Sequence, residues 1–347
     1  MDGKIGVVLV NTGTPRSPEV ADVRRYLGQF LNDPRVLDMP AWQRWLLLHL
    51  VILRTRPAKS AAAYRKIWTT RGSPLLVHGR DLAAGVQTHL GARAQVKLAF
   101  QFGEPTIPQA FQEFAEAGIT RVCVVPLFPQ YASASTGSAV QAAVATAAQR
   151  WVIPSLHVVP PFWQEPEFLD GVTQRLQEAL TQQKPDHILL SFHGVPEHHC
   201  TQTDVSGAHC LKSPECCDKL VAANASCYRA QSMATAREIL QRLQMDPQQA
   251  TVTFQSRLGR VPWIKPYTDV VLTELAQQGK RNVVVAEPSF VADCLETLEE
   301  IAIRGLADFR QAGGDNLTLV KSLNADADWT AGLARIIQRS CAWLQTP

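Results

Sequence analysis

The sequence lacks a long hydrophobic run and has little surplus charge of either sign. Its longest apolar run, 45–53, is interrupted by His49 and falls far short of the roughly 20 residues that a membrane-spanning helix needs. The chain has 34 Lys and Arg residues against 31 Asp and Glu residues, which is too balanced for a dedicated nucleic-acid surface. We therefore expect neither a transmembrane segment nor a nucleic-acid partner.

Glycine patterns that bind nucleotides and segments that direct export are also missing. The first strand-like run, 5–10, leads into Asn11-Thr12-Gly13, a turn that matches neither G-x-G-x-x-G nor the P-loop lysine pattern. The residues before this run contain neither an apolar signal region nor an arginine-rich transit sequence. We expect no nucleotide cofactor, and we expect a cytoplasmic protein.

Cysteine is sparse outside one short segment. Five of the eight cysteines fall within residues 200–227, namely Cys200, Cys210, Cys216, Cys217 and Cys227. In a reducing cytosol such a cluster indicates a metal site before disulfides. Zinc is one candidate, because His198, His199 and His209 lie among the thiols and Cys/His sets favour tetrahedral zinc. The spacing contains no C-x-x-C pair, so it does not identify the metal.

Short apolar runs alternate with segments of helical character, and a length of 347 residues suggests two domains. The strand-like runs are Ile5–Val10, Val96–Phe100, Val122–Pro126, Leu156–Val159, His187–Ser191, Thr251–Phe254, Asn282–Ala286 and Leu317–Leu323. The helix-like segments include Leu82–Leu90, Thr106–Ala117, Met233–Leu243 and Ala292–Arg304. This alternation predicts an α/β fold with two similar domains, 1–162 and 163–347, each with a four-stranded parallel sheet flanked by helices.

One strand-like run ends at a residue that can perform chemistry. The run 188–190 is followed by His193, Gly194 and Pro196. Ligands of parallel sheets bind beyond the carboxyl ends of the strands, and histidine can take or give a proton near neutrality. Gly194 has no Cβ that would keep a ligand from the backbone. The alternative is a core histidine that only ends a strand.

A row of acids follows the seventh strand-like run. On a helix, Asp293, Glu296 and Glu300 would lie on one face by their i+3 and i+4 spacing. Asp293 and Glu296 also fit a helix capping box, but Glu300 lies a turn further in and gains little from the helix dipole. We therefore expect an acidic row opposite His193 that can move protons and guide a divalent cation.

Aromatic and basic side chains mark further candidate contacts. Trp42 and Trp45 belong to the apolar segment 42–53, which is either a buried helix or a surface for a flat apolar ligand or a membrane. Other candidates follow the predicted strands. We expect substrate contacts from Thr12, Trp42, Trp45, Tyr131, Ser256, Arg257 and Trp263.

Three long motifs in this order resemble the ferrochelatase family. They are LLSFHGVP at 189–196, TFQSRLGRVP at 253–262 and FVADCLETLEEI at 290–301. Shorter matches extend the resemblance over nearly the whole chain, with NTGTP at 11–15, FLNDPRVLDMP at 30–40, GSPL at 72–75 and VVPLFPQYASASTGS at 124–138. The resemblance implies insertion of Fe²⁺ into a porphyrin to make haem, in a cleft between two Rossmann-like domains and without a nucleotide.

The resemblance also implies roles for individual residues. His193 matches the active-site histidine, to which removal of pyrrole protons or metal contact is assigned, and Glu296 matches its acidic partner. Glu300 and Asp293 match the acids that continue the row. Both His193 and Glu296 would then contact the substrate Fe²⁺. The segment 42–53 would be one side of the porphyrin site.

Some family members carry a [2Fe–2S] cluster, and four thiolates can hold one. The resemblance therefore implies an internally ligated cluster in this chain, held by Cys200, Cys210, Cys216 and Cys217, with Cys227 as the alternate. Zinc remains the rival metal.

The expected activity is insertion of Fe²⁺ into protoporphyrin IX, the terminal step of haem biosynthesis, with release of two protons. The alternatives are a coproporphyrin III ferrochelatase, a related cobalt chelatase and a non-catalytic tetrapyrrole-binding protein. A pure carrier would not need an acidic row, which favours an enzyme. Its expected partners are porphyrin and Fe²⁺, with peripheral contact to the inner membrane, and it would be a monomer or homodimer.

Overall fold

The computed structural model describes residues 3–259 and 261–345, so that Arg260 of the 253–262 motif lies outside the described residues. The chain forms two compact units. Unit 1 comprises Met1–Phe128, Ser133–Pro161 and Ala325–Pro347, and unit 2 comprises Pro129–Ala132 and Phe162–Asn324. Each unit contains its own sheet.

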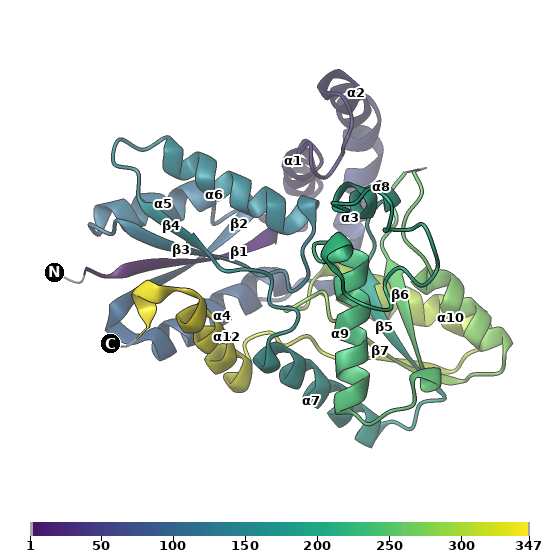
Figure 1. Ribbon diagram of the computed structural model, residues 1–347. Helices are drawn as coiled ribbons and strands as arrows, with labels where there is room; N and C mark the ends of the chain where they lie inside the picture. The colour runs from purple at the N-terminus through teal and green to yellow at the C-terminus, as the bar shows by residue number, and fades with distance from the viewer. Residues whose placement is uncertain (1–2, 260, 346–347) are drawn as a thin grey trace. The chain divides into compact units, whose positions relative to one another are not determined.

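Unit 1 is built on a four-stranded parallel sheet in the order β2-β1-β3-β4. Its strands are β1 (Ile5–Thr14), β2 (Ala94–Gly103), β3 (Arg121–Pro126) and β4 (Ser155–Val158). Its α-helices are α1 (Val20–Phe30), α2 (Ala41–Leu46), α3 (Leu53–Ile67), α4 (Pro74–Leu90), α5 (Ile107–Glu116), α6 (Ser138–Ala148) and α12 (Ala327–Ser340). Helices α5 and α6 cover one face of the sheet, and α4 lies on the opposite face with α12 against it (Figure 1).

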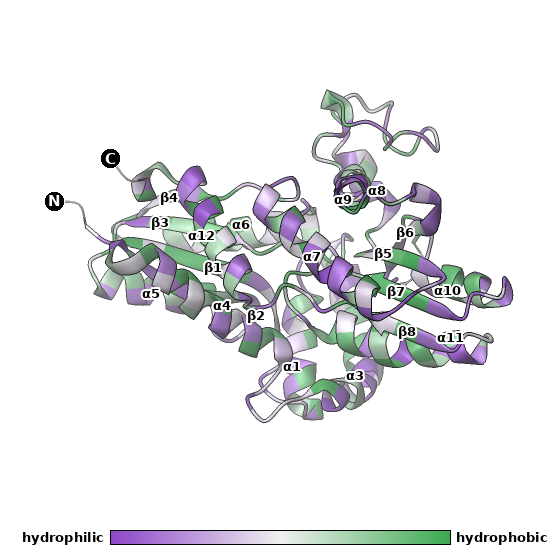
Figure 2. Ribbon diagram, turned by 90° about the horizontal axis from the view of Figure 1, so that it is seen from below, coloured by the Kyte–Doolittle hydropathy of each residue, from purple (hydrophilic) through white to green (hydrophobic). Residues whose placement is uncertain are grey.

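Unit 2 repeats the same strand order as β6-β5-β7-β8, again all parallel. Its strands are β5 (His187–His193), β6 (Ala250–Gln255), β7 (Asn282–Ala286) and β8 (Asn316–Leu319). Its α-helices are α7 (Pro166–Gln182), α8 (Glu197–Gln202), α9 (Tyr228–Arg242), α10 (Thr268–Gln277) and α11 (Leu306–Gln311). The hydropathy colouring of Figure 2 shows β5 and β7 as hydrophobic strands, as expected of strands buried on both faces.

The predicted fold class is confirmed, since two four-stranded parallel sheets are present. One predicted α-helix is different in kind: residues 296–305 form a π-helix, η6 (Glu296–Gly305), which α11 continues. Apolar and acidic residues at i+3 and i+4 do not distinguish an α-helix from this wider one. Asp293 precedes η6 and therefore does not belong to the helix.

The C-terminal helix belongs to unit 1, whereas we expected residues 163–347 to form one domain. Helix α12 packs on α4 at a point where a Cβ on Gly85 would lie 2.6 Å from Thr330 Cγ2. This close approach depends on glycine in α4. Contacts of this kind, between residues far apart in the sequence, decide where a terminal helix packs.

The apolar segment after α1 buries Leu48 and Ile52 but exposes most of its other large apolar side chains. Trp42 and Trp45 are 64% and 54% exposed on α2, and Leu50 and Val51 are exposed on the π-helix η1 (Leu47–Ile52) that follows. The interpretation of this segment as a buried helix is therefore wrong. Among the described residues, no helix is long and apolar enough to span a membrane.

Candidate active site and cysteine site

Three neighbouring strands of unit 2 end together at one edge of its sheet. β5 ends at His193, which pairs in register with Gln255, the last residue of β6. β7 ends at Ala286 and is followed at once by Glu287. Because the strands are parallel, all three carboxyl ends lie on the same edge, where ligands of such sheets bind.

The half-buried His193 is held by its backbone and by its ring. Its N–H donates to Ser289 Oγ (3.0 Å), and its Nδ1 lies 2.6 Å from the Gly194 carbonyl oxygen. A carbonyl oxygen only accepts hydrogen bonds, so Nδ1 carries the proton in this arrangement. In the neutral ring Nε2 then has the free lone pair and can accept a proton or bind a metal ion.

Gly194 has a different use from the one expected. A Cβ at this position would lie 2.8 Å from the Gln255 carbonyl oxygen and 3.2 Å from the indole of Trp263. The Gly194 N–H donates to that same carbonyl (2.7 Å). Because Gly194 has no side chain, the backbone of β6 and the indole of Trp263 can pack closely against it. We had expected this space to serve the approach of a ligand.

Gln255 connects the histidine with the acidic segment, and the sequence did not single it out. Its Oε1 accepts from Ser191 Oγ (2.5 Å), while its Nε2 donates to the backbone carbonyl of Glu296 (3.1 Å). Gln255 is also the register partner of His193. Gln255 thus fixes the position of the start of η6 relative to the end of β5. The half-buried Glu296 at the start of η6 is thereby positioned relative to His193 at the end of β5. The sequence feature that could have identified Gln255 is its position at the end of a predicted strand that neighbours β5.

The acids of the predicted row have unequal surroundings. The Asp293 carboxylate accepts from the Asn324 amide (2.8 Å) and from the Ser322 N–H (3.2 Å), so it stabilises the turn before η6. Thr297 Oγ1 accepts from the Cys294 N–H (3.0 Å), a contact that takes the place of the expected capping box. Glu296 begins η6, and its side chain interacts with the Cys294 thiol.

Glu300 is held by Ser256, which we expected to contact substrate. The Ser256 N–H and Oγ donate to the two Glu300 carboxylate oxygens at 3.0 and 2.5 Å. Ser256 has φ of 66°, in the left-handed region that is unusual for serine. Burial raises the pKa of Glu300, although Ser256, Arg304 and His193 oppose this effect.

Glu287 is a further acid at this edge that the sequence did not single out. It is 6% exposed, and among the described residues neither carboxylate oxygen makes a hydrogen bond of normal geometry. Burial raises its pKa well above the usual carboxyl range, the neighbouring Gln255 side chain lowers it, and Glu300, Asp293 and Glu296 raise it further. The sequence signal is a glutamate immediately after a buried strand.

The other predicted substrate contacts are divided between the units. Trp263 is buried and donates through Nε1 to the Leu258 carbonyl (2.9 Å), and exposed Arg257 pairs with Asp269 and lies 4.1 Å from the Tyr267 ring centroid. Tyr131 also belongs to unit 2 and is half-buried. Thr12, Trp42 and Trp45 belong to unit 1.

All five cysteines of the 200–227 segment are buried in unit 2. Cys216 and Cys217 have their sulfurs 3.6 Å apart, and the Cys227 thiol interacts with those of Cys200 and Cys217. Burial, followed by the nearby Cys227, raises the pKa of Cys210 to about 12, and interaction with Cys200 raises that of Cys227 to about 11. The thiols therefore converge, with Cys227 in contact with the others.

Donors surround this cysteine site. Arg229 Nη1 lies 3.1 Å from Cys217 Sγ, and the Leu211 N–H donates to Cys216 Sγ (3.4 Å). The buried Asn224 donates to the carbonyls of Cys216 (2.8 Å) and Lys219 (2.9 Å), which holds the loop in place. Positive charge and N–H groups directed at sulfur stabilise thiolates.

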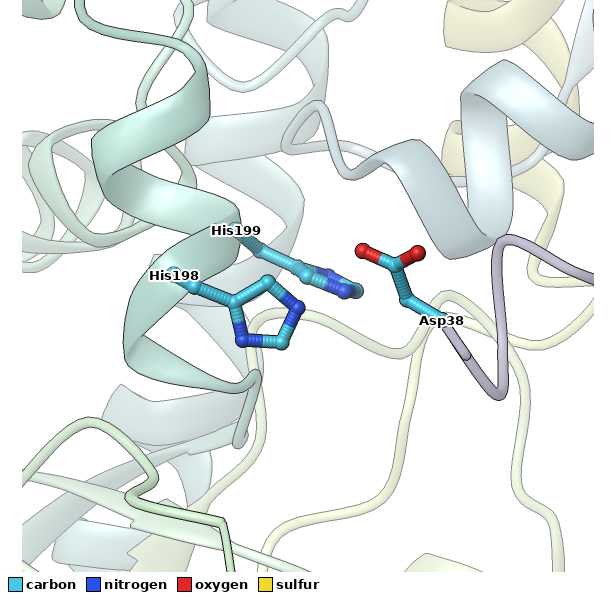
Figure 3. A group of neighbouring side chains, drawn as sticks. All are labelled: Asp38, His198 and His199. Carbon is cyan, nitrogen blue, oxygen red and sulfur yellow. The ribbon is translucent and has the colours of Figure 1, made fainter. Parts of the chain in front are cut away.

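The three histidines near the thiols, His198, His199 and His209, have different contacts. His209 Nε2 lies 2.8 Å from the Cys216 carbonyl oxygen, which occupies it with a backbone contact. His198 and His199 project from α8 with ring centroids 4.6 Å apart (Figure 3).

Comparison with solved structures defines the class of fold. The sirohydrochlorin chelatase SirB from Bacillus subtilis subspecies spizizenii, in complex with cobalt, matches with a TM-score of 0.55 at 12% identity over 98% of this chain and 96% of that one. SirB from Bacillus subtilis with Fe³⁺ matches equally well, at 13% identity. The fold is therefore that of the α/β chelatases.

Sequence comparison identifies the family. The model of the family Ferrochelatase matches residues 4–341. A ferrochelatase of Ectopseudomonas mendocina is 46% identical over 96% of this chain and 97% of its own length, and one of Coxiella burnetii is 42% identical over 98% and 94%. The chain belongs to the ferrochelatase family.

The environment of Glu287 predicts how stability depends on pH. Because its pKa is raised in the folded state, the folded protein keeps a proton that the unfolded chain has already lost, and stability falls as pH rises from about 5. Glu287→Gln cannot titrate, so its stability relative to wild type should increase between pH 5 and pH 8. Urea unfolding at both pH values, with a chelator present, measures this, and an advantage independent of pH would contradict it.

Proposed function

We propose that this chain, an enzyme of the ferrochelatase family that inserts Fe²⁺ into a porphyrin as the terminal step of haem synthesis, uses His193 and Glu296 as its reacting pair. The observation that carries this proposal is the link through Gln255, which is paired with His193 in register and bonded to the Glu296 carbonyl. A base and a carboxylate are thereby held at one sheet edge.

The reaction requires acceptors for two protons. A porphyrin loses both inner N–H protons as Fe²⁺ enters, so that two Fe–N bonds form with the electron pairs that the departing protons leave behind and the other two with the lone pairs of the nitrogens that carry no proton. His193 Nε2 accepts one proton, which its Nδ1–H bond to Gly194 favours by fixing the tautomer. The Glu296 carboxylate accepts the other or contacts the incoming ion, and Glu300 extends the acidic path.

The porphyrin proposed is protoporphyrin IX, which has fewer peripheral carboxylates than coproporphyrin III. The exposed apolar surface at Trp42 and Trp45 supports the less charged of the two substrates.

His193→Ala should lower the rate of metal insertion by at least about 100-fold, because the proton acceptor is lost. Glu296→Gln should have an effect of similar direction. The assay follows Fe²⁺ or Zn²⁺ insertion into protoporphyrin IX, with coproporphyrin III as a competing substrate. The exposed His89 on α4 is the matched control, and His89→Ala should keep wild-type turnover. Turnover retained by His193→Ala would remove the proposed mechanism.

We also propose that the cysteine site holds a [2Fe–2S] cluster. Support comes from the donor set, which consists of buried thiols near Arg229, with Cys216 next to Cys217 and Cys227 next to Cys200, Cys210 and Cys217. His209 Nε2 lies against the Cys216 carbonyl oxygen, so the donors that converge here are thiols, the ligands that such a cluster uses. A bound cluster would cross-link the segment 200–227 and supply a centre that can gain or lose one electron. From the sequence we expected Cys227 only as an alternate ligand, whereas its contacts with the other thiols favour it as one of the ligands.

Serine variants of all five cysteines would identify the ligands. Cys227→Ser and Cys217→Ser should abolish the visible absorbance and the bound iron of aerobically purified protein, because each removes a thiolate from the set. Cys123→Ser, a buried cysteine of β3 in unit 1, is the control and should keep both signals. Colourless wild-type protein that contains zinc and no iron would contradict the cluster.

We further propose peripheral contact with the cytoplasmic membrane through the exposed segment 42–51, by a cytoplasmic protein that is a monomer or homodimer. Trp42 and Trp45 are suited to the interface of a bilayer, where an apolar ligand would be transferred.

The double variant Trp42→Ala, Trp45→Ala should bind vesicles of mixed zwitterionic and anionic lipids roughly tenfold more weakly than wild type, because two interfacial aromatic groups are lost. Co-sedimentation at low salt measures this binding. Trp151→Ala removes a tryptophan outside the segment that is more exposed than either of the two, and it serves as the control. Wild-type protein that stays entirely in the supernatant would refute the membrane contact.

A further inference from the structure

Glu287 is a buried acid that the proposed mechanism does not use. It follows β7 directly, at the edge where β5 ends in His193 and β6 in Gln255. Its residue is 6% exposed and its two carboxylate oxygens are buried without a hydrogen bond of normal geometry in the described part of the chain. Buried polar groups without partners are rare in native proteins, and a role in binding an ion is a common reason for one.

The surroundings of Glu287 show what kind of partner would fit. Glu300, Asp293 and Glu296 all lie close enough to disfavour its ionised form. Gln255, the neighbour that favours ionisation, directs one amide hydrogen to the Glu296 carbonyl. A group surrounded by acids in this way is stabilised by positive charge, and oxygen-rich sets of this kind suit hard divalent cations.

A structural role explains Glu287 less well than it explains the other buried acids. Asp293 is 6% exposed like Glu287, but its carboxylate accepts hydrogen bonds from Asn324 and Ser322. Glu299 is 8% exposed and pairs with Arg304 (3.6 Å). Among the described residues, Glu287 makes no hydrogen bond of normal geometry and has only the Gln255 side chain beside it, so it is the acid of this edge that is most available to a cation.

We propose that Glu287 is a carboxylate ligand for the divalent metal ion at the inner end of the acidic row, next to Gln255 and the reacting pair His193 and Glu296. The proposal rests on the function proposed above and adds a ligand to it. Fe²⁺ would reach Glu287 from Glu300 and Glu296, and the buried carboxyl group would release its proton to solvent as it bonds to the metal. In this position Glu287 would hold the ion beside His193 before insertion.

Mn²⁺ is the probe for this site, because it prefers carboxylate oxygen and discriminates against the cysteine thiolates. The full chain without porphyrin is titrated with Mn²⁺, and the free ion is measured by electron paramagnetic resonance. Glu287→Gln, which keeps the size of the side chain, should raise the Kd of Mn²⁺ by on the order of 10-fold or more. Glu287→Asp keeps a carboxylate and should bind more tightly than Glu287→Gln.

Two further variants make the outcome decisive. Glu299 is about as buried as Glu287 but already pairs with Arg304. Glu299→Gln should therefore leave the Kd of Mn²⁺ within twofold of the wild-type value. If Glu296→Gln weakens Mn²⁺ binding while Glu287→Gln does not, the role of Glu287 is refuted and the rest of the acidic row stands. If neither variant changes the Kd, the row does not bind the cation, and both this inference and the proposed metal path fail. Loss of turnover in His193→Ala tests the reacting pair independently of either result.

Discussion

The arrangement of the candidate active site depends on the common direction of β5, β6 and β7. Parallel strands bring their carboxyl ends to one edge, and here those ends are His193, Gln255 and Ala286, with Glu287 one residue further. The side chain of Gln255 links the strand that carries the histidine with the acidic segment, because it is bonded both to the Ser191 hydroxyl in β5 and to the backbone carbonyl of the first residue of η6.

Electrostatics at this edge impose a second constraint. Four carboxyl groups, those of Glu287, Asp293, Glu296 and Glu300, gather there, and burial makes their charge costly. The protein compensates for two of them with hydrogen bonds, through Asn324 and Ser322 for Asp293 and through Ser256 for Glu300. The remaining negative charge suits a reaction in which a divalent cation arrives and two protons leave.

The same logic separates the cysteine site from the acidic edge. Soft thiolates near Arg229 and hard carboxylates at the strand ends lie in one unit, yet they select different metals. In the proposed function, substrate iron would meet oxygen ligands at the strand ends, and the proposed cluster would be held by sulfur ligands.

The eight strands, the parallel sheets, the histidine at a strand end and the grouping of cysteines could be predicted from residue patterns, because alternation and apolar runs are local properties of the chain. The other features appear only in the folded protein. The tertiary structure placed α12 with unit 1, made residues 296–305 a π-helix, assigned the missing side chain of Gly194 to the approach of β6, and revealed Gln255 and Glu287. These features depend on contacts between segments that are distant in the sequence. A local residue pattern does not show which distant donor or backbone carbonyl will lie next to a given residue.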